Sequence, residues 1–102
     1  MLSMTTLTSA QRKWLRGQAH ALKPVVQIGK QGLTEGTIRQ VDEALDAHEL
    51  IKVQAVVPRE EKEEIATRLA SEVDAEVAGR IGHVIILYRE NPDPEERVYE
   101  LP

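Results

Sequence analysis

The residues with the clearest chemical potential are the four in Gly29-Lys30-Gln31-Gly32. Two glycines separated by two positions let the backbone take dihedral angles closed to other residues, and they remove the Cβ atoms that would hold a ligand away. A helix is expected to begin just afterwards at Thr34-Glu35, so free N–H groups and the positive end of a helix dipole would lie near this loop. Lys30 adds a mobile cation. The loop is therefore a candidate site for a phosphate group.

A GxxG loop of this kind clamps the nucleic-acid backbone in KH-type modules without reading the bases. The same residues could instead form only a tight turn between a strand and a helix, and a lone GxxG pattern does not decide between the two. The phosphate-loop pattern G-x-x-x-x-G-K-[ST] and the dinucleotide pattern G-x-G-x-x-G are both absent. The sequence therefore gives little support to nucleotide hydrolysis.

Charge is divided unevenly along the chain, whose formal net charge is −4. Residues 1–33 carry five basic and no acidic side chains, whereas residues 34–102 carry eight basic and 17 acidic ones. Arg12 and Arg16 would be neighbours on one face of a helix, with Lys13 beside them. This face could bind a polyanion, or it could be an ordinary solvated helix surface. We expect the basic helix and the GxxG loop to meet in space.

Hydrophobic periodicity predicts the elements that position these residues. Apolar residues three and four positions apart predict helices, and runs rich in Ile and Val predict strands. The predicted helices span 8–22, 34–47 and 59–73, and the predicted strands span 25–28, 50–57, 75–81 and 83–88. Thr8 and Gln11 fit a capping box, Gly82 fits a turn between the last two strands, and Val98 to Leu101 could pair briefly as an edge strand.

The predicted order α-β-α-β-α-β-β indicates an α/β fold. The simplest arrangement is a two-layer sandwich in which three helices cover one face of a four-stranded sheet. We divide the chain into an N-terminal extension (1–7), one domain (8–89) and an acidic, proline-broken C-terminal tail (90–102). A chain of 102 residues is too short for a second independent core.

Composition excludes several classes of protein. Hydrophobic residues make up 41% and charged residues 29% of the chain, which is typical of a globular domain. The absence of cysteine excludes a disulfide framework and a Cys-ligated zinc site, and it suits a reducing cytoplasm. No apolar run approaches the roughly 20 residues that span a bilayer, and the N-terminus lacks a signal-peptide pattern. We expect a soluble cytoplasmic protein without a membrane partner.

The remaining polar and aromatic residues suggest no catalytic site. His20, His48 and His83 fall in different predicted elements without metal-ligand spacing. The acidic run at 60–64 is typical of a solvated helix start, and no set of nucleophile, base and orienting group can be assembled. Trp14 could stack on a base, although packing is the more usual role. We predict that the protein is not an enzyme and uses no metal, cofactor or small-molecule substrate.

Several segments together resemble a known family. They are Leu7-Thr8-Ser9, Gln11-Arg12-Lys13, Leu15-Arg16-Gly17, Ala19-His20, Lys23-Pro24-Val25-Val26-Gln27-Ile28-Gly29-Lys30, Gly32-Leu33-Thr34-Glu35-Gly36, Asp42-Glu43-Ala44-Leu45 and His48-Glu49-Leu50-Ile51-Lys52-Val53. In this combination they are similar to single-domain CRM proteins of the bacterial YhbY type, over about residues 7–89. The CRM name refers to chloroplast RNA splicing and ribosome maturation. The chain departs from the family at Gln54 and His83, where relatives often carry a basic residue.

The resemblance implies an RNA-binding module whose fold is similar to the C-terminal domain of bacterial translation initiation factor three. It implies that residues 29–32 are the GxxG loop of the family, and that the partner is ribosomal RNA in precursors of the large ribosomal subunit. The residues that we expect to contact RNA are Gly29, Lys30, Gln31, Gly32, Arg12, Lys13, Arg16, Lys23 and Lys52. The alternative function is a protein-interaction module that docks its basic helix on an acidic partner.

Overall fold

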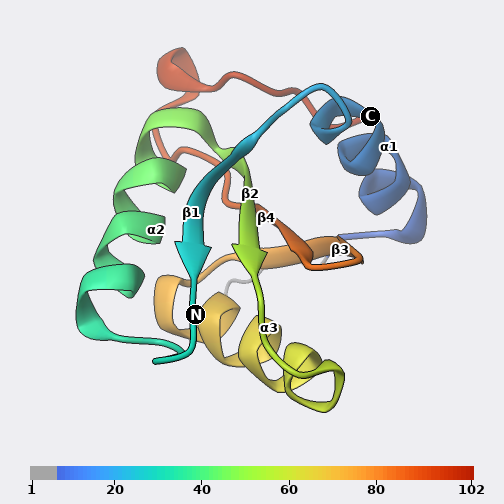
Figure 1. The fold of residues 1–102 in the computed structure, drawn as a ribbon. Helices are drawn as coiled ribbons and strands as arrows, with labels where there is room; N and C mark the ends of the chain where they lie inside the picture. Colours follow the sequence, from blue (N-terminus) through green and yellow to red (C-terminus); the bar gives the residue numbers. More distant parts are fainter. Residues whose placement is uncertain (1–6) are drawn as a thin grey trace.

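The computed structural model describes residues 7–102, which form three α-helices and a four-stranded sheet (Figure 1). The helices are α1 (Ser9–Ala19), α2 (Glu35–His48) and α3 (Arg59–Val73), and the strands are β1 (Pro24–Ile28), β2 (Leu50–Ala55), β3 (Glu76–Ile81) and β4 (Val84–Tyr88). A short 3-10 helix, η1 (Pro94–Glu96), follows. The predicted class and element order are confirmed. Of the predicted N-terminal extension, residues 1–6 lie outside the described residues, and Leu7 is buried.

The strands are arranged in the order β1-β2-β4-β3, with β1 parallel to β2 and the other pairs antiparallel. Parallel neighbours need a crossover connection, and α2 supplies it between β1 and β2. The predicted turn between β3 and β4 is confirmed at Gly82, where φ is +58°. Because β2 is antiparallel to β4 and parallel to β1, the last residues of β1 and β2 lie at the end of the sheet where this turn is found. We call it the loop end, and we call the opposite end, where Leu50 pairs with Tyr88, the tail end.

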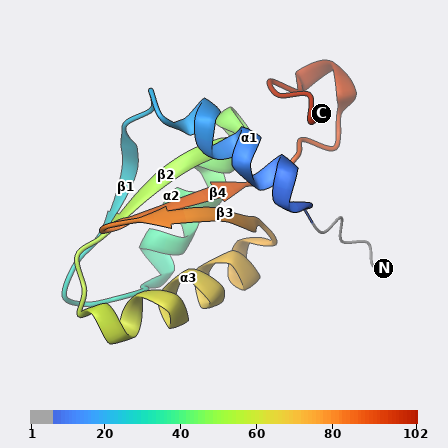
Figure 2. The ribbon, with the colours of Figure 1, turned by 90° about the vertical axis from the view of Figure 1, so that its right-hand side faces the viewer.

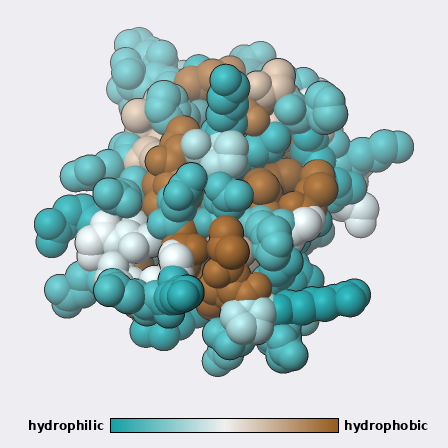
Figure 3. All heavy atoms as spheres, in the orientation of Figure 1, coloured by the Kyte–Doolittle hydropathy of each residue, from teal (hydrophilic) through white to brown (hydrophobic). Residues whose placement is uncertain are grey.

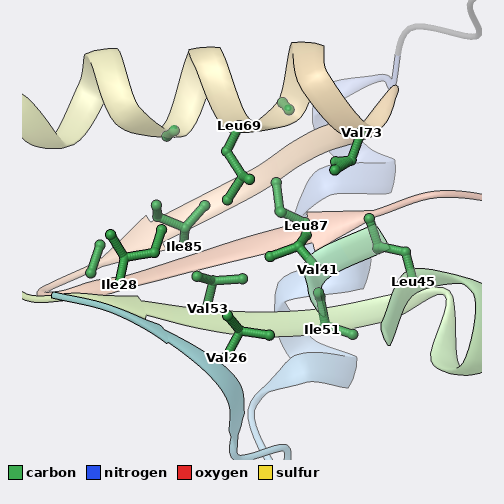
Figure 4. Packing of buried hydrophobic residues seen from close by; sticks show 13 residues of the cluster. Val26, Ile28, Val41, Leu45, Ile51, Val53, Leu69, Val73, Ile85 and Leu87 are labelled. Atoms are coloured by element: carbon green, nitrogen blue, oxygen red, sulfur yellow. The ribbon is translucent and has the colours of Figure 1, made fainter. Parts of the chain in front are cut away.

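Two helices, α2 and α3, pack on one face of the sheet. Alternate residues of the two central strands, among them Val53 and Ile85, point to this face and are almost fully buried. They contact Val41 of α2 and Leu69 of α3 in one apolar cluster (Figure 4). Burial of each such side chain contributes about 1.5–3 kcal/mol. This layer fixes the start of α2, and hence the connection between β1 and α2.

The first helix packs on the opposite face (Figure 2). The expectation that all three helices cover one face is therefore wrong. Leu15 and Ala19 of α1 are fully buried against Leu50 and Ile86, which point away from α2 and α3. The four residues 85–88 of β4 are all buried, since the strand is covered on both faces. A sheet with one solvated face would show alternation instead.

Residues 90–102 fold back over the tail end of the sheet toward α1. Tyr99 and Leu101 are half-buried and pack against the apolar cluster between α1 and the sheet. The rings of Trp14 and Tyr99 meet edge to face, with their centroids 6.3 Å apart. The predicted edge strand at 98–101 does not form. Its first two N–H groups, those of Val98 and Tyr99, instead donate to the buried carboxylate of Glu49.

Candidate nucleic-acid interface

The GxxG segment forms an exposed turn at the loop end of the sheet. The N–H of Gly32 donates to the carbonyl oxygen of Gly29 at 3.0 Å, which closes the turn. Gly32 has φ +73°, a left-handed conformation that favours glycine. A Cβ atom added at Gly29 or at Gly32 would have no neighbour within 4 Å. The backbone of the turn is therefore accessible at both glycines.

The residues flanking the turn leave Lys30 as its free cation. Lys30 and Gln31 are exposed, and neither side chain has a hydrogen-bond partner within residues 7–102. Thr34 caps α2, because its hydroxyl oxygen accepts the N–H of Thr37 at 3.1 Å. Glu35 is an exposed acid in the first turn of α2. An anion at the loop would thus rely on the turn backbone and Lys30 more than on the helix terminus.

The basic residues of α1 differ in how free they are. Lys13 is exposed and Arg12 is half-buried, and neither side chain has a partner among the described residues. Arg16 is also half-buried, but its Nη1 donates to the carbonyl oxygen of Ala78 in β3 at 3.0 Å. Its aliphatic stem lies against Gly79, where a Cβ would come within 2.5 Å of the Arg16 Cδ. Arg16 thus joins α1 to β3, while Arg12 and Lys13 remain available to a ligand.

Lys52 and Lys23 lie where α1 is connected to β1. The ammonium group of Lys52 donates to the carbonyl oxygens of Leu22 at 2.9 Å and of His20 at 3.4 Å. These carbonyls follow the last turn of α1 and have no partner in the helix itself. Lys52 therefore fixes the end of α1, whereas Lys23 is exposed.

The structure does not bring the GxxG loop beside the basic helix, and that expectation is wrong. The α1–β1 connection lies at the start of β1, and the GxxG loop follows its end (Figures 1 and 2). β1 has five residues, so about 16 Å of strand separates the two, at a rise of about 3.3 Å per residue. α1 also does not fold back along β1, because Leu15 and Arg16 hold it across the sheet toward β3.

The sequence reasoning did not predict a contact between two polar side chains, Gln27 and Gln54, on the sheet between the sites. The amide of Gln27 in β1 donates to the side-chain oxygen of Gln54 in β2 at 3.3 Å. Val26 and Ile28 point into the cluster beneath α2, so Gln27 points to the α1 face, where it is exposed. The alternation in residues 25–28 was the available signal for Gln27, whereas Gln54 was noted only as a departure from the family.

Other kinds of site find no support in the described part of the chain. Among residues 7–102, no three His, Asp or Glu side chains lie together as metal ligands do. None of the helices formed by these residues is long and apolar enough to cross a bilayer.

Comparison with known proteins agrees with the geometry. A family model described as the CRS1 / YhbY (CRM) domain matches residues 7–89. A Haemophilus influenzae protein named RNA-binding protein is 44% identical over 100 residues, which cover 97% of this chain and 98% of that relative. Bacillus subtilis YqeI, named a probable RNA-binding protein, is 40% identical over 97 residues, 94% of this chain and 99% of the relative.

A solved structure shares the fold. The solution structure of Staphylococcus aureus SAV1595 superposes with a TM-score of 0.82 at 39% sequence identity, over 95% of this chain and 100% of that one. The family inferred from the sequence motifs is thereby confirmed. With its motifs, its fold and its matches in agreement over nearly its whole length, the chain belongs to the CRS1 / YhbY (CRM) domain family.

Proposed function

We propose that this protein is a non-catalytic RNA-binding protein of the cytoplasm that binds ribosomal RNA in precursors of the large ribosomal subunit during assembly. The names of its relatives support RNA as the partner. The observation that carries the proposal is the exposed GxxG turn, whose backbone has no side chain in front of it and whose only cation, Lys30, is unpaired within the described residues.

The loop would act as a clamp on one stretch of phosphates. Because no Cβ atom projects from Gly29 or Gly32, a sugar-phosphate backbone can approach the turn to hydrogen-bond distance. Lys30 then supplies charge next to the phosphate. Contacts of this kind position a protein on RNA without selecting a base sequence.

Lys23, which precedes β1, would form a second contact that the length of β1 separates from the loop, and Arg12 and Lys13 of α1 would add further contacts. Contacts separated from the loop by at least the length of β1, about 16 Å, suit a folded RNA better than one short extended strand. Gln27 and Gln54 lie on the sheet between them and can hydrogen-bond to RNA without adding charge. Specificity would then come from the shape of the RNA.

Filter binding of a ribosomal RNA fragment over a range of salt concentrations tests the proposal. The variant carries Lys13→Ala and Lys30→Ala, since neither side chain has a hydrogen-bond partner among residues 7–102 whose loss would affect folding. We expect weaker binding and a salt slope reduced by about 1 for each cation removed. The matched control is Arg68→Ala, which removes an exposed cation from α3 and should bind as the parent does.

Affinity and slope that stay unchanged in the double variant would contradict the RNA clamp. Capture of an acidic protein by the parent but not by the variant, at equal salt, would then favour the protein-interaction module. The ribosomal part of the proposal has its own test, which is where the protein sediments in a gradient of ribosomal particles. We expect it with large-subunit precursors, and its absence from them would contradict that role.

A further inference from the structure

A cavity of about 320 Å³ lies at the tail end of the sheet, on the side of β1. It is bounded by the α1–β1 connection, the end of α2 and the C-terminal segment, which come together near the top of Figure 1. Hydrophobic atoms are exposed in that region in Figure 3. Its apolar walls are Leu22, Val25, Leu50 and Val98, and Tyr99 adds an aromatic ring.

The cavity follows from the lengths of the two parallel strands. β2 begins at Leu50, but its pairing with β1 begins only at Lys52, which is opposite Pro24. The first two residues of β2 therefore have no β1 neighbour. The space at this corner of the sheet is closed only in part, by Val98 and Tyr99 of the C-terminal segment.

The walls are fixed by hydrogen bonds before any ligand arrives. The carboxylate of Glu49 accepts the N–H of Val98 at 2.6 Å and that of Tyr99 at 3.0 Å. On the other side, the Lys52 ammonium holds the carbonyl oxygen of Leu22. Trp14 supports the Tyr99 ring edge to face, with the ring planes at 85°. A preformed cavity loses less entropy on binding than one that must be assembled.

Lys23 places a positive charge at the rim of the cavity, and His48 is a second exposed polar residue there. Among residues 7–102, no acidic side chain lines the cavity. An apolar cleft with an aromatic wall and a cation at its edge suits a ligand that has a flat, uncharged ring system. An anionic group attached to that ring system would lie beside the cation. A nucleobase joined to its phosphates has this distribution. Single-stranded binding proteins use the same combination of aromatic stacking and cationic groove.

We propose that this cavity binds one unstacked base of the bound RNA, with Tyr99 against the base and Lys23 beside the neighbouring phosphate. The inference rests on the proposed function, but it adds a contact that the phosphate clamp does not need. Glu49 is a positioning residue for this site, because it holds the backbone of Val98 and Tyr99 and lies behind the wall. An RNA whose bases are all paired could not use the site.

The test compares a short single-stranded RNA with a strand of equal length and charge in which abasic residues replace the nucleotides. Trp14 is the only tryptophan in the chain, and its contact with Tyr99 makes its fluorescence a local reporter. We expect the full-length protein to bind the base-containing strand about tenfold more tightly, within the range for one stacked base. Tyr99→Ala should remove this preference and leave binding to the abasic strand unchanged.

Tyr99→Phe is the matched control, since it keeps the ring and should keep the preference. If Tyr99→Ala does not fold, Val25→Phe replaces it, because Val25 is 51% exposed and a ring there would fill the cavity from the rim. Equal, salt-dependent binding of both strands by the parent would overturn the base site and leave the phosphate clamp standing. Failure to bind either strand or ribosomal RNA would instead overturn the proposed function. Binding of free adenosine monophosphate as tightly as the strand would overturn a site for RNA in favour of one for a nucleotide.

Discussion

The carboxylate of Glu49 accepts the backbone N–H of Val98 at 2.6 Å, across 49 positions of the sequence. Glu49 is 1% exposed and also accepts the N–H groups of Tyr99 and Asn91. Its own backbone is unusual, with φ at +65° and ψ at −44° between α2 and β2. A residue other than glycine rarely adopts these backbone dihedral angles unless other interactions offset the strain. The three charge-assisted hydrogen bonds to the Glu49 carboxylate offset this strain. They also attach the C-terminal segment to the sheet.

Replacing Glu49 should therefore destabilise the protein more than its position in a turn would indicate. We expect Glu49→Ala to lower the free energy of unfolding by about 2–3 kcal/mol, because the N–H groups of Asn91, Val98 and Tyr99 lose a charged acceptor. Urea unfolding measures the change. Glu43→Ala, which removes an exposed acid of α2, is the control and should change stability by less than about 0.5 kcal/mol. Equal stability of the two variants would show that the segment is not held in this way.

Arg16 and Gly79 should be energetically coupled. Gly79→Ala would place a Cβ within 2.5 Å of the Arg16 Cδ, so the arginine must move and its bond to the Ala78 carbonyl is lost. We expect each single variant, Gly79→Ala and Arg16→Ala, to cost about 1 kcal/mol. In the double variant the second change should cost much less than it does alone. Thermal unfolding of all four proteins completes the cycle, and simple additivity would refute the contact.

The two glycines of the GxxG turn should respond differently to alanine. Gly32 has φ +73°, so Gly32→Ala should lower the free energy of unfolding by about 1 kcal/mol. Gly29 has no left-handed φ and open space around it, so Gly29→Ala should leave stability unchanged. Its new methyl group would still stand between the turn and a phosphate, and we expect roughly tenfold weaker RNA binding. Unaltered RNA affinity in Gly29→Ala would show that the loop is only a turn between β1 and α2 and does not bind a phosphate.

Stability at high pH should depend on Tyr88. Burial, with the nearby charges of Glu49 and Glu90, raises the pKa of Tyr88 to about 12. In the unfolded chain the pKa of tyrosine is about 10. Below about pH 10 both states keep the proton and stability is full. Between about pH 10 and 12 only the unfolded chain loses the proton, so the free energy of unfolding falls by about 1.4 kcal/mol per pH unit.

Tyr88→Phe isolates this contribution from other groups that titrate in the same range. The Tyr88 hydroxyl is buried without a hydrogen-bond partner among the described residues, so the substitution should cost little at neutral pH. Urea unfolding from neutral to alkaline pH should show a shallower decline in Tyr88→Phe than in the parent. Parallel declines would mean that Tyr88 titrates alike in the folded and unfolded chains.

Local sequence was sufficient for the three α-helices, the four strands and the GxxG turn, although not for the edge strand expected at 98–101. The apolar periodicity of α3 gave both of its ends, and the capping box of Thr8 and Gln11 formed as predicted. Gly82 and Gly32 both take positive φ in turns. These features depend on interactions within a few residues, namely caps, turns and one apolar face per element, which is why a single sequence reveals them. The family motifs likewise lie in continuous segments.

Tertiary structure alone decided where the cations point and what the C-terminal segment does. Sequence placed Arg16 and Lys52 among the RNA contacts, but both donate to backbone carbonyls 30 or more positions away. It also placed α1 next to the GxxG loop and allowed an edge strand at 98–101 that does not form. The side of the sheet that a helix covers, and the acceptor that a buried carboxylate provides, depend on packing between distant segments. Local charge and apolar periodicity do not determine how distant segments pack. The separation of α1 from the GxxG loop and the cavity at Tyr99 are therefore visible only in the tertiary structure.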